Sequence, residues 1–467
     1  PGNVGSATAA TGYNVANSVR FDDGSNCQMR RAGVAGGNQD KFTLSMWIKR
    51  ANISTDHPRL FTSVASGDDR FEIYFEDTDE LHIEGVDNGT ATLNLVTSRK
   101  FRDVSAWYHI LLAVDTGQGT EANRAKLYIN GVLETAFGTS TRPDQDGNIG
   151  INTDSFPLQI GERSGYGVDF DGYFAEIVFL DGAQSANTDL GEFDEDSGIW
   201  KPIDVSGLTF GTNGFYLDFE DSSALGNDAA GSNNFTVNNL TAVDQSTDTC
   251  TNNFATMNPL DNFFAANTYS EGNTKFVTKA SGGFAYGTST IGLSSGKWYA
   301  EFDCIATTDS GAYHQVGIVE KPSGSTTTSG TANIGSTAYS WGYYAADGKS
   351  RTGGSYTNYG NSWTTGDIIG VLLNLDDNEL KFSKNGTIQN SGTAISITAA
   401  ANNGTGYYFI TAGGMSTGAS VTFEANFGNP HQALSSAVAD GNGFGAFEYA
   451  PPSGFFAICT KNLAESG

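Results

Sequence analysis

Residues 107–133 read WYHILLAVDTGQGTEANRAKLYINGVL. An apolar run fills positions 107–115, and apolar and polar residues alternate from 125 to 129. Asn130-Gly131 follows at once, and this pair readily adopts the positive φ values of a two-residue hairpin turn. The stretch therefore predicts β-strands joined by tight turns.

The same pattern recurs along most of the chain. Apolar or alternating runs of about five to nine residues, bounded by Gly, Asn and Asp, are typical of strands. The composition agrees, with 59 glycines and 12 % aromatic but only 16 % charged residues among 467. A helical pattern occurs only near 187–196 and is long enough for a single turn. We expect an all-β chain, with its clearest strands at 42–49, 71–76, 81–84, 107–115, 125–129, 174–180, 297–305, 315–319, 368–375, 379–383, 407–412 and 421–427.

Composition also divides the chain into segments. Residues 1–14 are small and polar and predict a flexible N-terminal arm. After Phe219 small and amide residues replace the apolar runs, which predicts a Gly/Ser/Asn-rich linker over 221–265 between two β-sandwich domains, 15–220 and 266–430. Residues 431–467 are expected to be a C-terminal tail whose apolar run 455–459 returns as an edge strand.

The charge and the cysteines exclude several classes of partner and site. Acidic residues outnumber basic ones by 52 to 25, a formal net charge of −27 that repels phosphate backbones, so we expect no nucleic-acid partner. No run of 18 apolar residues occurs, so we expect no membrane insertion. The four cysteines lie far apart without metal-ligand spacing, which predicts free, mostly buried thiols.

Two sets of segments carry a family resemblance. FTLSMWIKR (42–50), WYHILLAVD (107–115), AKLYINGVL (125–133) and DGYFAEIVFLDGA (171–183) resemble, in order and spacing, the laminin-G-like or concanavalin-A-like jelly roll. GKWYAEF (296–302), VGIV (316–319), YSWGYYAADGK (339–349), GDIIGVLLNLDDNELKFSKNG (366–386), YYFITAG (407–413) and VTFEANFG (421–428) resemble SPRY modules. The resemblances imply two β-sandwich (jelly-roll) domains.

The join between these domains carries a further resemblance. SSALGNDAAGSNNFTVNNLTAVDQSTDTCTNNFATMNPLD (222–261) and the ending FEYAPPSGFFAICTKNL (447–463) are similar to segments of tailed-phage virion proteins. This implies a bacteriophage tail fibre, receptor-binding or head-decoration protein on the virion surface. Such a lectin-like host-adhesion protein binds a host cell-surface glycan or protein, contacts other virion proteins, and gains avidity as a homo-oligomer.

The main alternative is a polysaccharide depolymerase or glucanase on the same fold. These enzymes place two carboxylates across a sugar, and the glucanase relatives carry Glu-x-Asp-x-x-Glu on one strand. The nearest string here, Glu192-Phe193-Asp194-Glu195-Asp196-Ser197, lacks the last acid and lies in a turn-rich segment. No HxH, HExxH or GxSxG pattern occurs, and His109 is predicted to lie in a core.

We therefore expect a recognition protein without enzymatic activity. A structural virion protein that mainly contacts other virion subunits is a third alternative, in which the loops face those subunits.

Laminin-G-like domains often hold calcium at the rim of the sandwich, and Ca²⁺ prefers carboxylate and carbonyl oxygens. The resemblance implies that loop acids supply such a site, with Asp144, Asp146, Asp169 and Asp171 as its candidates. Asp68-Asp69 and Asp77 with Asp79 are other groups of loop acids. No repeat spacing selects one group, and solvated turn acids are the alternative for each; no cofactor is required.

Aromatic residues are dense between 341 and 363, in a stretch rich in Gly, Ser and Asn. Such loops stack on sugar rings or grip peptides. In SPRY modules the counterparts of Trp341 and Tyr359 belong to the framework. The residues expected to face a ligand are Tyr343, Tyr344, Tyr356 and Trp363.

Overall fold

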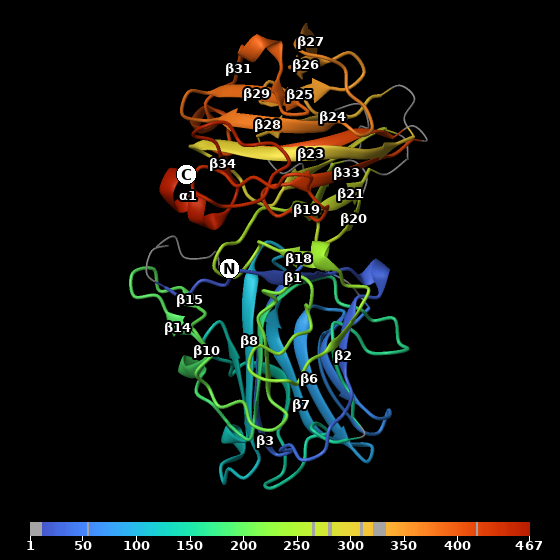
Figure 1. Ribbon diagram of the computed structural model, residues 1–467, viewed down its shortest axis with the longest axis vertical. Helices are drawn as coiled ribbons and strands as arrows, with labels where there is room; N and C mark the ends of the chain where they lie inside the picture. Colours follow the sequence, from blue (N-terminus) through green and yellow to red (C-terminus); the bar gives the residue numbers. More distant parts are fainter. Residues whose placement is uncertain are drawn as a thin grey trace. The chain divides into compact units, whose positions relative to one another are not determined.

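The chain forms two compact units, Pro1–Asn253 and Phe254–Gly467, in a computed structural model (Figure 1). The structure describes residues 12–53, 56–154, 156–263, 267–278, 283–308, 312–320, 333–416 and 419–467. Almost all regular structure in these ranges is β-strand. The all-β, two-sandwich prediction is confirmed.

Two antiparallel sheets build the first unit. Sheet A follows the order β10 (Val132–Leu133), β9 (Ala125–Ile129), β8 (Trp107–Asp115), β3 (Lys41–Arg50), β13 (Gly172–Asp181), β1 (Ser18–Phe21), β18 (Gln245–Ser246), with β16 (Phe215–Leu217) on β13. Sheet B follows β11 (Phe137–Thr141), β7 (Thr90–Lys100), β6 (Glu80–Asp87), β5 (Arg70–Phe75), β4 (Arg59–Val64), β12 (Leu158–Ile160), β2 (Gln28–Arg31), β17 (Thr236–Asn238). A small hairpin pairs β14 (Glu192–Phe193) with β15 (Trp200–Lys201).

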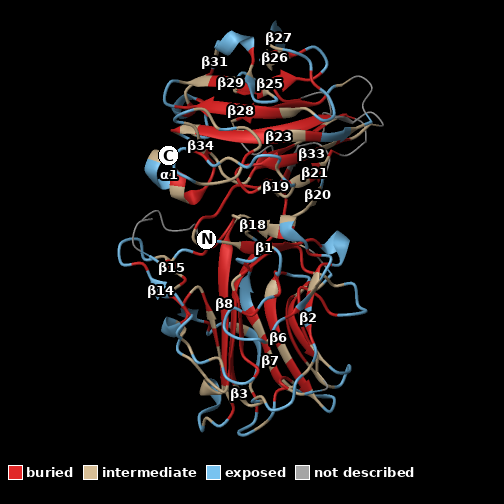
Figure 2. Cartoon of the chain, viewed as in Figure 1, coloured by how far each residue is buried: buried red, intermediate tan, exposed pale blue. Residues whose placement is uncertain are grey.

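The core of this unit lies between the two sheets. Ile48 and Ile110 of sheet A and Ile73 and Leu95 of sheet B belong to one buried cluster. Each side chain removes apolar area from water, worth roughly 1.5–3 kcal/mol for a fully buried aliphatic residue. Figure 2 shows β8 buried over most of its length, because sheet A is covered on its outer face as well.

Residues 236–253 are an ordered part of the first unit, which corrects the linker interpretation of 221–265, and the part around Cys250 lies in that cover. β17 and β18 add a strand to each sheet, and Lys49 Nζ lies 2.7 Å from Asp248 Oδ2 and 2.8 Å from Asn253 Oδ1. Trp107 Nε1 donates to the other Asp248 oxygen at 3.0 Å. The small polar residues of this segment resemble a linker in sequence. In the structure they form strands β17 and β18 and contribute Asp248 to a buried ion pair. The remainder of the expected linker, from Phe254, lies in the second unit.

The segment around Tyr13 also lies on sheet A, so the predicted flexible arm is corrected for residues 12–14; residues 1–11 lie outside the described ranges. The Tyr13 hydroxyl donates to Glu176 Oε2 at 3.2 Å and lies 2.9 Å from the Tyr216 hydroxyl, which donates to the same oxygen at 2.7 Å. Glu176 sits at a bulge of β13 with φ 49°. Burial raises the pKa of Glu176 to about 8.

The Asn130-Gly131 turn joins β9 to β10 as predicted, with φ values of 48° and 74°. A Cβ atom on Gly131 would lie 2.1 Å from the Trp200 ring, so no larger residue fits. Trp200 Nε1 donates to His109 Nδ1 at 2.9 Å, and His109 Nε2 lies 2.7 Å from Ser45 Oγ. Because the indole only donates, His109 accepts at Nδ1 and donates from Nε2 as a neutral core residue, as predicted.

The second unit is a sandwich of the same kind. One sheet follows β19 (Met257–Phe263), β22 (Gly283–Ser289), β32 (Phe409–Ser416), β24 (Gln315–Val319), β25 (Ser340–Tyr344), β26 (Lys349–Thr352), β27 (Ser355–Asn358). The other follows β20 (Thr268–Ser270), β21 (Lys275–Val277), β33 (Val421–Asn426), β23 (Lys297–Thr307), β28 (Ile368–Asn374), β29 (Glu379–Lys384), β30 (Thr387–Ile388), with β31 (Ile395–Ser396) on β29.

The C-terminal segment is an integral layer of this unit, which corrects its description as a tail. β34 (Phe456–Ala457), within the run expected to be a strand, pairs with β23 and is followed by helix α1 (Thr460–Ser466). Buried Glu301 of β23 accepts the backbone N–H groups of Glu448 and Tyr449, both at 2.9 Å. The segment therefore covers an outer sheet face by side-chain contacts that have no sequence periodicity.

Two further expectations concern the cysteines and the membrane. All four cysteines are free and buried, as predicted. Among the described residues, no helix has the length and apolar character needed to cross a bilayer.

The buried ion pair gives a first prediction. Lys49→Met leaves the Asp248 carboxylate buried without its cation, and we expect the first unit to lose about 3–5 kcal/mol of unfolding free energy. Hydrogen exchange of peptides from β3 and β13 in a denaturant series measures this loss. Lys41→Met is the matched control on the same strand, since its partner Asp115 forms a more exposed pair, worth less than about 1 kcal/mol. Equal losses in the two variants would contradict the role of the buried pair.

Glu176 gives a second prediction, for pH. The folded state holds the Glu176 proton up to about pH 8, whereas the unfolded chain releases it near its ordinary pKa of 4.5. Between these values the folded state binds more protons, so its stability falls as pH rises, by on the order of 1 kcal/mol per pH unit. We expect Glu176→Gln to flatten this part of the stability profile of the first unit. An unchanged slope in Glu176→Gln would assign the effect to other groups.

Candidate functional site

The outer face of sheet B is the open sheet face of the first unit. Segments around Val15, Trp200 and Cys250 pack on the outer face of sheet A, and a second cluster around Leu190 and Val205 does the same. On β7, by contrast, buried and partly exposed residues alternate through its centre, as in a sheet with one solvated face. A ligand that binds a sheet of this unit therefore meets sheet B.

Strand β5, RFEIYF at 70–75, places charge on that face by simple alternation. Phe71, Ile73 and Phe75 point into the core and are fully buried. Arg70, Glu72 and Tyr74 occupy the alternate positions and so lie on the opposite face. The strand thus presents a cation, an anion and a phenol ring in one row.

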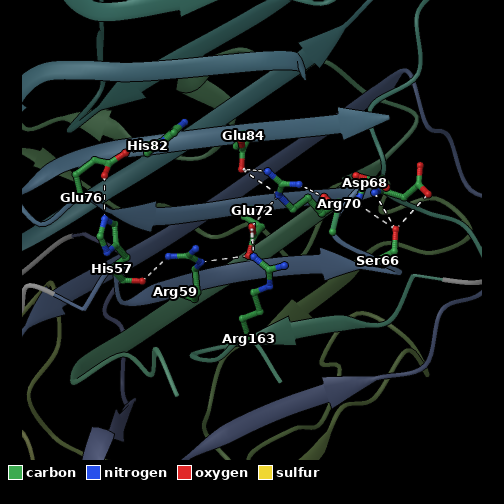
Figure 3. A network of polar contacts seen from close by, with 12 residues as sticks. His57, Arg59, Ser66, Asp68, Arg70, Glu72, Glu76, His82, Glu84 and Arg163 are labelled. Carbon is green, nitrogen blue, oxygen red and sulfur yellow. Dashed lines mark hydrogen bonds and ion pairs between the residues drawn. The ribbon is translucent and has the colours of Figure 1, made fainter. Parts of the chain in front are cut away.

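Glu72 is the centre of a charged network on this face, which Figure 3 shows. Its carboxylate is fully buried and accepts Arg59 Nε at 3.1 Å and Arg163 Nη1 at 3.0 Å, and Arg70 Nε lies 3.3 Å away. The Arg59 guanidinium also lies 3.8 Å from the centroid of the Tyr74 ring. One carboxylate therefore positions three arginines, which come from β4, β5 and the loop after β12.

A second glutamate explains why Arg70 is needed. Glu72 and Glu84 are direct neighbours across the β5–β6 ladder, and like charges in that position repel. Arg70 donates to Glu84 Oε2 from Nε at 3.1 Å and from Nη2 at 2.9 Å while it also faces Glu72. The guanidinium bridges the two carboxylates and removes the conflict.

Histidines and acids gather at the other end of the network. His82 Nδ1 lies 2.5 Å from Glu76 Oε1, and His57 Nε2 lies 3.3 Å from Glu76 Oε2. Ligand atoms of His57, Glu76 and Asp77 lie within 4.8 Å of one another, which is close enough for a divalent metal ion. Imidazole with carboxylate suits a transition metal better than calcium.

An open pocket of about 240 Å³ lies beside the network, and we call it the Arg163 pocket. Tyr166 is 61 % exposed, and its ring centroid lies 3.8 Å from the guanidinium carbon of Arg163. The glycines on both sides of Tyr166 have positive φ, so the loop bends sharply around this residue. The pocket is lined by Arg30, Val64, Ala65, Ser66, Gly67, Pro157, Gln159, Arg163, Ser164 and Tyr166.

The four aromatic residues predicted to face a ligand do not lie on one surface. Tyr343 and Trp363 are core residues of the second unit, at 0 % and 2 % exposure, so their assignment as ligand-facing is corrected. Tyr344 is also buried, at 7 % exposure, so its assignment is corrected as well. Its ring lies 5.5 Å from that of Tyr356, which is 46 % exposed. Aromatic residues thus fill the core of this unit even where the sequence around them is rich in glycine.

The four acids predicted to hold calcium lie on two separate loops. Asp144 and Asp146 are exposed beside a turn at Gly147. Asp171 is buried and accepts the Asn52 amide at 3.0 Å, and burial raises the pKa of Asp169, with Asp23 adding to the rise. Among the described residues, none of these four belongs to a group of three or more possible metal ligands.

The acidic string at 192–197 forms a hairpin turn. Asp194 Oδ1 accepts the backbone N–H groups of Asp196 and Ser197, at 3.2 and 2.9 Å, and these bonds to Ser197 lower the Asp194 pKa to about 2. Its other oxygen lies 3.2 Å from Lys201 Nζ. Asp194 is thus a turn residue with an ion pair, as expected, although its side chain is buried at 8 % exposure, whereas Glu195 and Asp196 are solvated.

The sequence patterns did not predict the two charged residues of the Arg163 pocket, Arg30 and Arg163. Arg30 and Arg163 lie far apart in the chain and meet only because β2 and β12 pair. One available signal was the alternation Arg70-x-Glu72-x-Tyr74, which predicts a charged outer face on a strand whose other face is apolar.

The network gives a third prediction. Glu72→Gln removes the carboxylate that three arginines share, and we expect the first unit to lose about 3 kcal/mol of unfolding free energy. Glu84→Gln, on the neighbouring strand and more exposed, is the control, with an expected loss of about 1 kcal/mol. Denaturant-dependent hydrogen exchange of β4 and β5 peptides distinguishes the two. A loss in Glu72→Gln no larger than in the control would contradict the central place of Glu72.

Comparison with known proteins agrees with this architecture. The model of the concanavalin A-like lectin/glucanases superfamily matches residues 22–188, and the SPRY domain model matches residues 297–428. The ATP-dependent RNA helicase DDX1 of Xenopus laevis is 33 % identical over 98 residues, and a probable helicase of this type from Dictyostelium discoideum is 34 % identical over 97. These segments cover 21 % of this chain but only 12 % and 11 % of the two helicases.

Solved structures with related folds include the SPRY domain of human HERC1 and a heptameric SAP-like pentraxin from Limulus polyphemus. The HERC1 domain is 21 % identical to this chain, and the match covers 36 % of this chain and 96 % of the HERC1 domain, with a TM-score of 0.29. The second is 15 % identical, with coverage of 37 % and 80 % and a TM-score of 0.28. The chain thus carries a concanavalin A-like lectin domain followed by a SPRY domain, a combination that points to carbohydrate or protein binding.

Proposed function

We propose that this chain is a non-enzymatic recognition protein and that its concanavalin A-like unit binds a carbohydrate in the Arg163 pocket. The observation that carries the proposal is the exposed Tyr166 ring, stacked on Arg163 beside a polar pocket on the open face of sheet B. An aromatic ring at the edge of such a pocket offers a flat apolar surface to one face of a sugar.

The lining of the pocket matches the remaining chemistry of a sugar. Ser66, Gln159 and Ser164 contribute hydroxyl and amide groups, which both donate to and accept from sugar hydroxyls. The pocket, of about 240 Å³, is open to solvent and suits one unit of a longer glycan rather than a whole buried ligand. Weak binding of one unit gains strength when several copies act together.

The arrangement of acids supports a role without catalysis. Hydrolysis of a glycoside needs two carboxylates that face the sugar. Glu72 is instead held by three arginines, and Asp194 is held in a turn by Ser197. The carboxylates of these two residues are already engaged in structural contacts.

A second candidate function is protein recognition by the SPRY unit. Tyr313 and Tyr356 are 41 % and 46 % exposed, and their rings lie 6.1 and 5.5 Å from that of Tyr344. Arg351 lies 5.1 Å from the centroid of the Tyr356 ring. Tyrosine and arginine are enriched at protein interfaces, so this group favours a protein partner.

The proposal also includes where the protein acts, on the surface of a tailed-phage virion. The resemblance of residues 222–261 and 447–463 to tailed-phage segments supports a place on a virion surface, with a host cell-surface glycan or protein as the target. Flanking capsid or tail genes in the genome of origin test this placement, and a neighbourhood without virion genes contradicts it.

The fourth prediction tests the glycan site. Tyr166→Ala removes the stacking ring, and we expect about a tenfold loss of affinity for a bound glycan, since the apolar ring area buried against the sugar contributes about 1.5 kcal/mol. A glycan array probed with the full chain identifies the ligand, and calorimetry measures the loss.

Tyr356→Ala is the matched control, an exposed tyrosine of the other unit. A loss in Tyr356→Ala with none in Tyr166→Ala would move the glycan site to the SPRY unit. New reducing ends released from the bound polysaccharide would replace the binding role with an enzymatic one.

A further inference from the structure

We infer that the sugar recognised by the Arg163 pocket carries an anionic group, a carboxylate, sulfate or phosphate. The inference rests on the proposed function and defines its ligand more narrowly. Acidic residues outnumber basic ones by 52 to 25 over the whole chain. The lining of this pocket reverses that balance, because it contains two arginines and no acidic residue.

Contacts with Glu72 and Tyr166 fix the Arg163 guanidinium at the pocket, where it can bind an anionic group. Its Nη1 donates to Glu72 at 3.0 Å, and the Tyr166 ring covers the guanidinium from a distance of 3.8 Å. The side chain is 8 % exposed, and its Nε has no hydrogen-bond acceptor among the described residues. A buried donor without an acceptor is costly, and an oxyanion of the ligand would remove this cost.

The pairing of Arg163 with Glu72 leaves positive charge in excess. Glu72 is shared with Arg59 and Arg70, and Arg70 also binds Glu84. Three guanidinium groups thus face two carboxylates. At the end of the network next to the pocket, guanidinium groups therefore outnumber carboxylates, while Glu76 lies at the other end. Low solvent exposure weakens the screening of these charges.

Arg30 supplies the second cation, from β2. It is exposed, and within the described part of the chain it makes no hydrogen bond or ion pair. Its charge acts on Glu162, whose pKa is raised by burial and by Asp169 and lowered by Arg30. Arg30 keeps donors available for a ligand because no carboxylate lies within ion-pair distance.

The two arginines lie on different elements and line one pocket that also holds a stacking ring. A neutral sugar would be bound by the Tyr166 ring and by the hydroxyl and amide groups of the pocket, without the arginines. A sugar that bears a carboxylate, sulfate or phosphate also uses the guanidinium groups, which bind oxyanions in a two-pronged geometry.

The test uses the full chain and matched pairs of immobilised oligosaccharides. The pairs are oligogalacturonate with its carboxyl-reduced form, an oligomer of sialic acid with its carboxyl-reduced form, a heparin fragment with its desulfated form, and a phosphorylated mannose oligomer with its dephosphorylated form. We expect at least one acidic member to bind more tightly than its neutral partner, with an affinity that falls as salt rises.

Arg30→Gln is the test variant, because the Arg30 side chain makes no hydrogen bond or ion pair among the described residues, and Gln keeps the strand pairing of β2 with β12 and β17. We expect about a tenfold loss of affinity for the acidic member and no change for the neutral one. Lys126→Gln, on β9 of the other sheet, is the matched control and should bind like the wild type. The thermal midpoint of each variant verifies that it is folded.

The outcomes separate the inference from the proposed function. Equal binding of acidic and neutral members, lost in Tyr166→Ala, overturns the anionic ligand and leaves the glycan site standing. Acidic binding that Arg30→Gln does not weaken also overturns the inference. Failure of every pair, together with no ligand on the array, overturns both, and capture of an acidic peptide in place of a glycan does the same.

Discussion

The buried ion pair of Lys49 with Asp248 anchors the last segment of the first unit on the outer face of sheet A. Asp248 belongs to the segment that follows the family-like part of the domain, and its carboxylate also accepts the indole N–H of Trp107. Both charges are excluded from water, so the pair is favourable only while its geometry is intact. By holding residues 245–253 on sheet A, it helps to keep that outer face closed, together with the apolar clusters around Trp200 and Leu190.

The strands and turns of this protein were predictable because their signals are local. Asn130-Gly131 has the turn geometry that its residue types favour, and strands such as 107–115 and 125–129 formed where the apolar pattern placed them. The covering segments 236–253 and 431–467 were not predictable in this way. Their residues are small, polar or glycine-rich, and they are ordered by bonds such as Glu301 to the N–H groups of Glu448 and Tyr449.

The candidate site was less accessible from sequence than the fold. Tyr343 and Trp363 stand in a glycine-rich stretch that looks like a binding loop, yet both side chains fill the core of the SPRY unit. The Arg163 pocket draws its residues from β2, β4, β12 and the following loop, which are brought together only by strand pairing. Without the register of sheet B, nothing in the sequence places Arg30 beside Arg163.

Gly131 couples the conformation of the β9–β10 turn to the packing of Trp200. Its positive φ serves the hairpin, and its missing side chain makes room for Trp200, which in turn holds the tautomer of His109. A residue with a side chain at this position would strain the turn and displace the indole in the same step. The residues that this turn can accept are therefore limited by the packing of a tryptophan 69 positions away. A change of turn type would require a simultaneous change in the segment around Trp200 that covers sheet A.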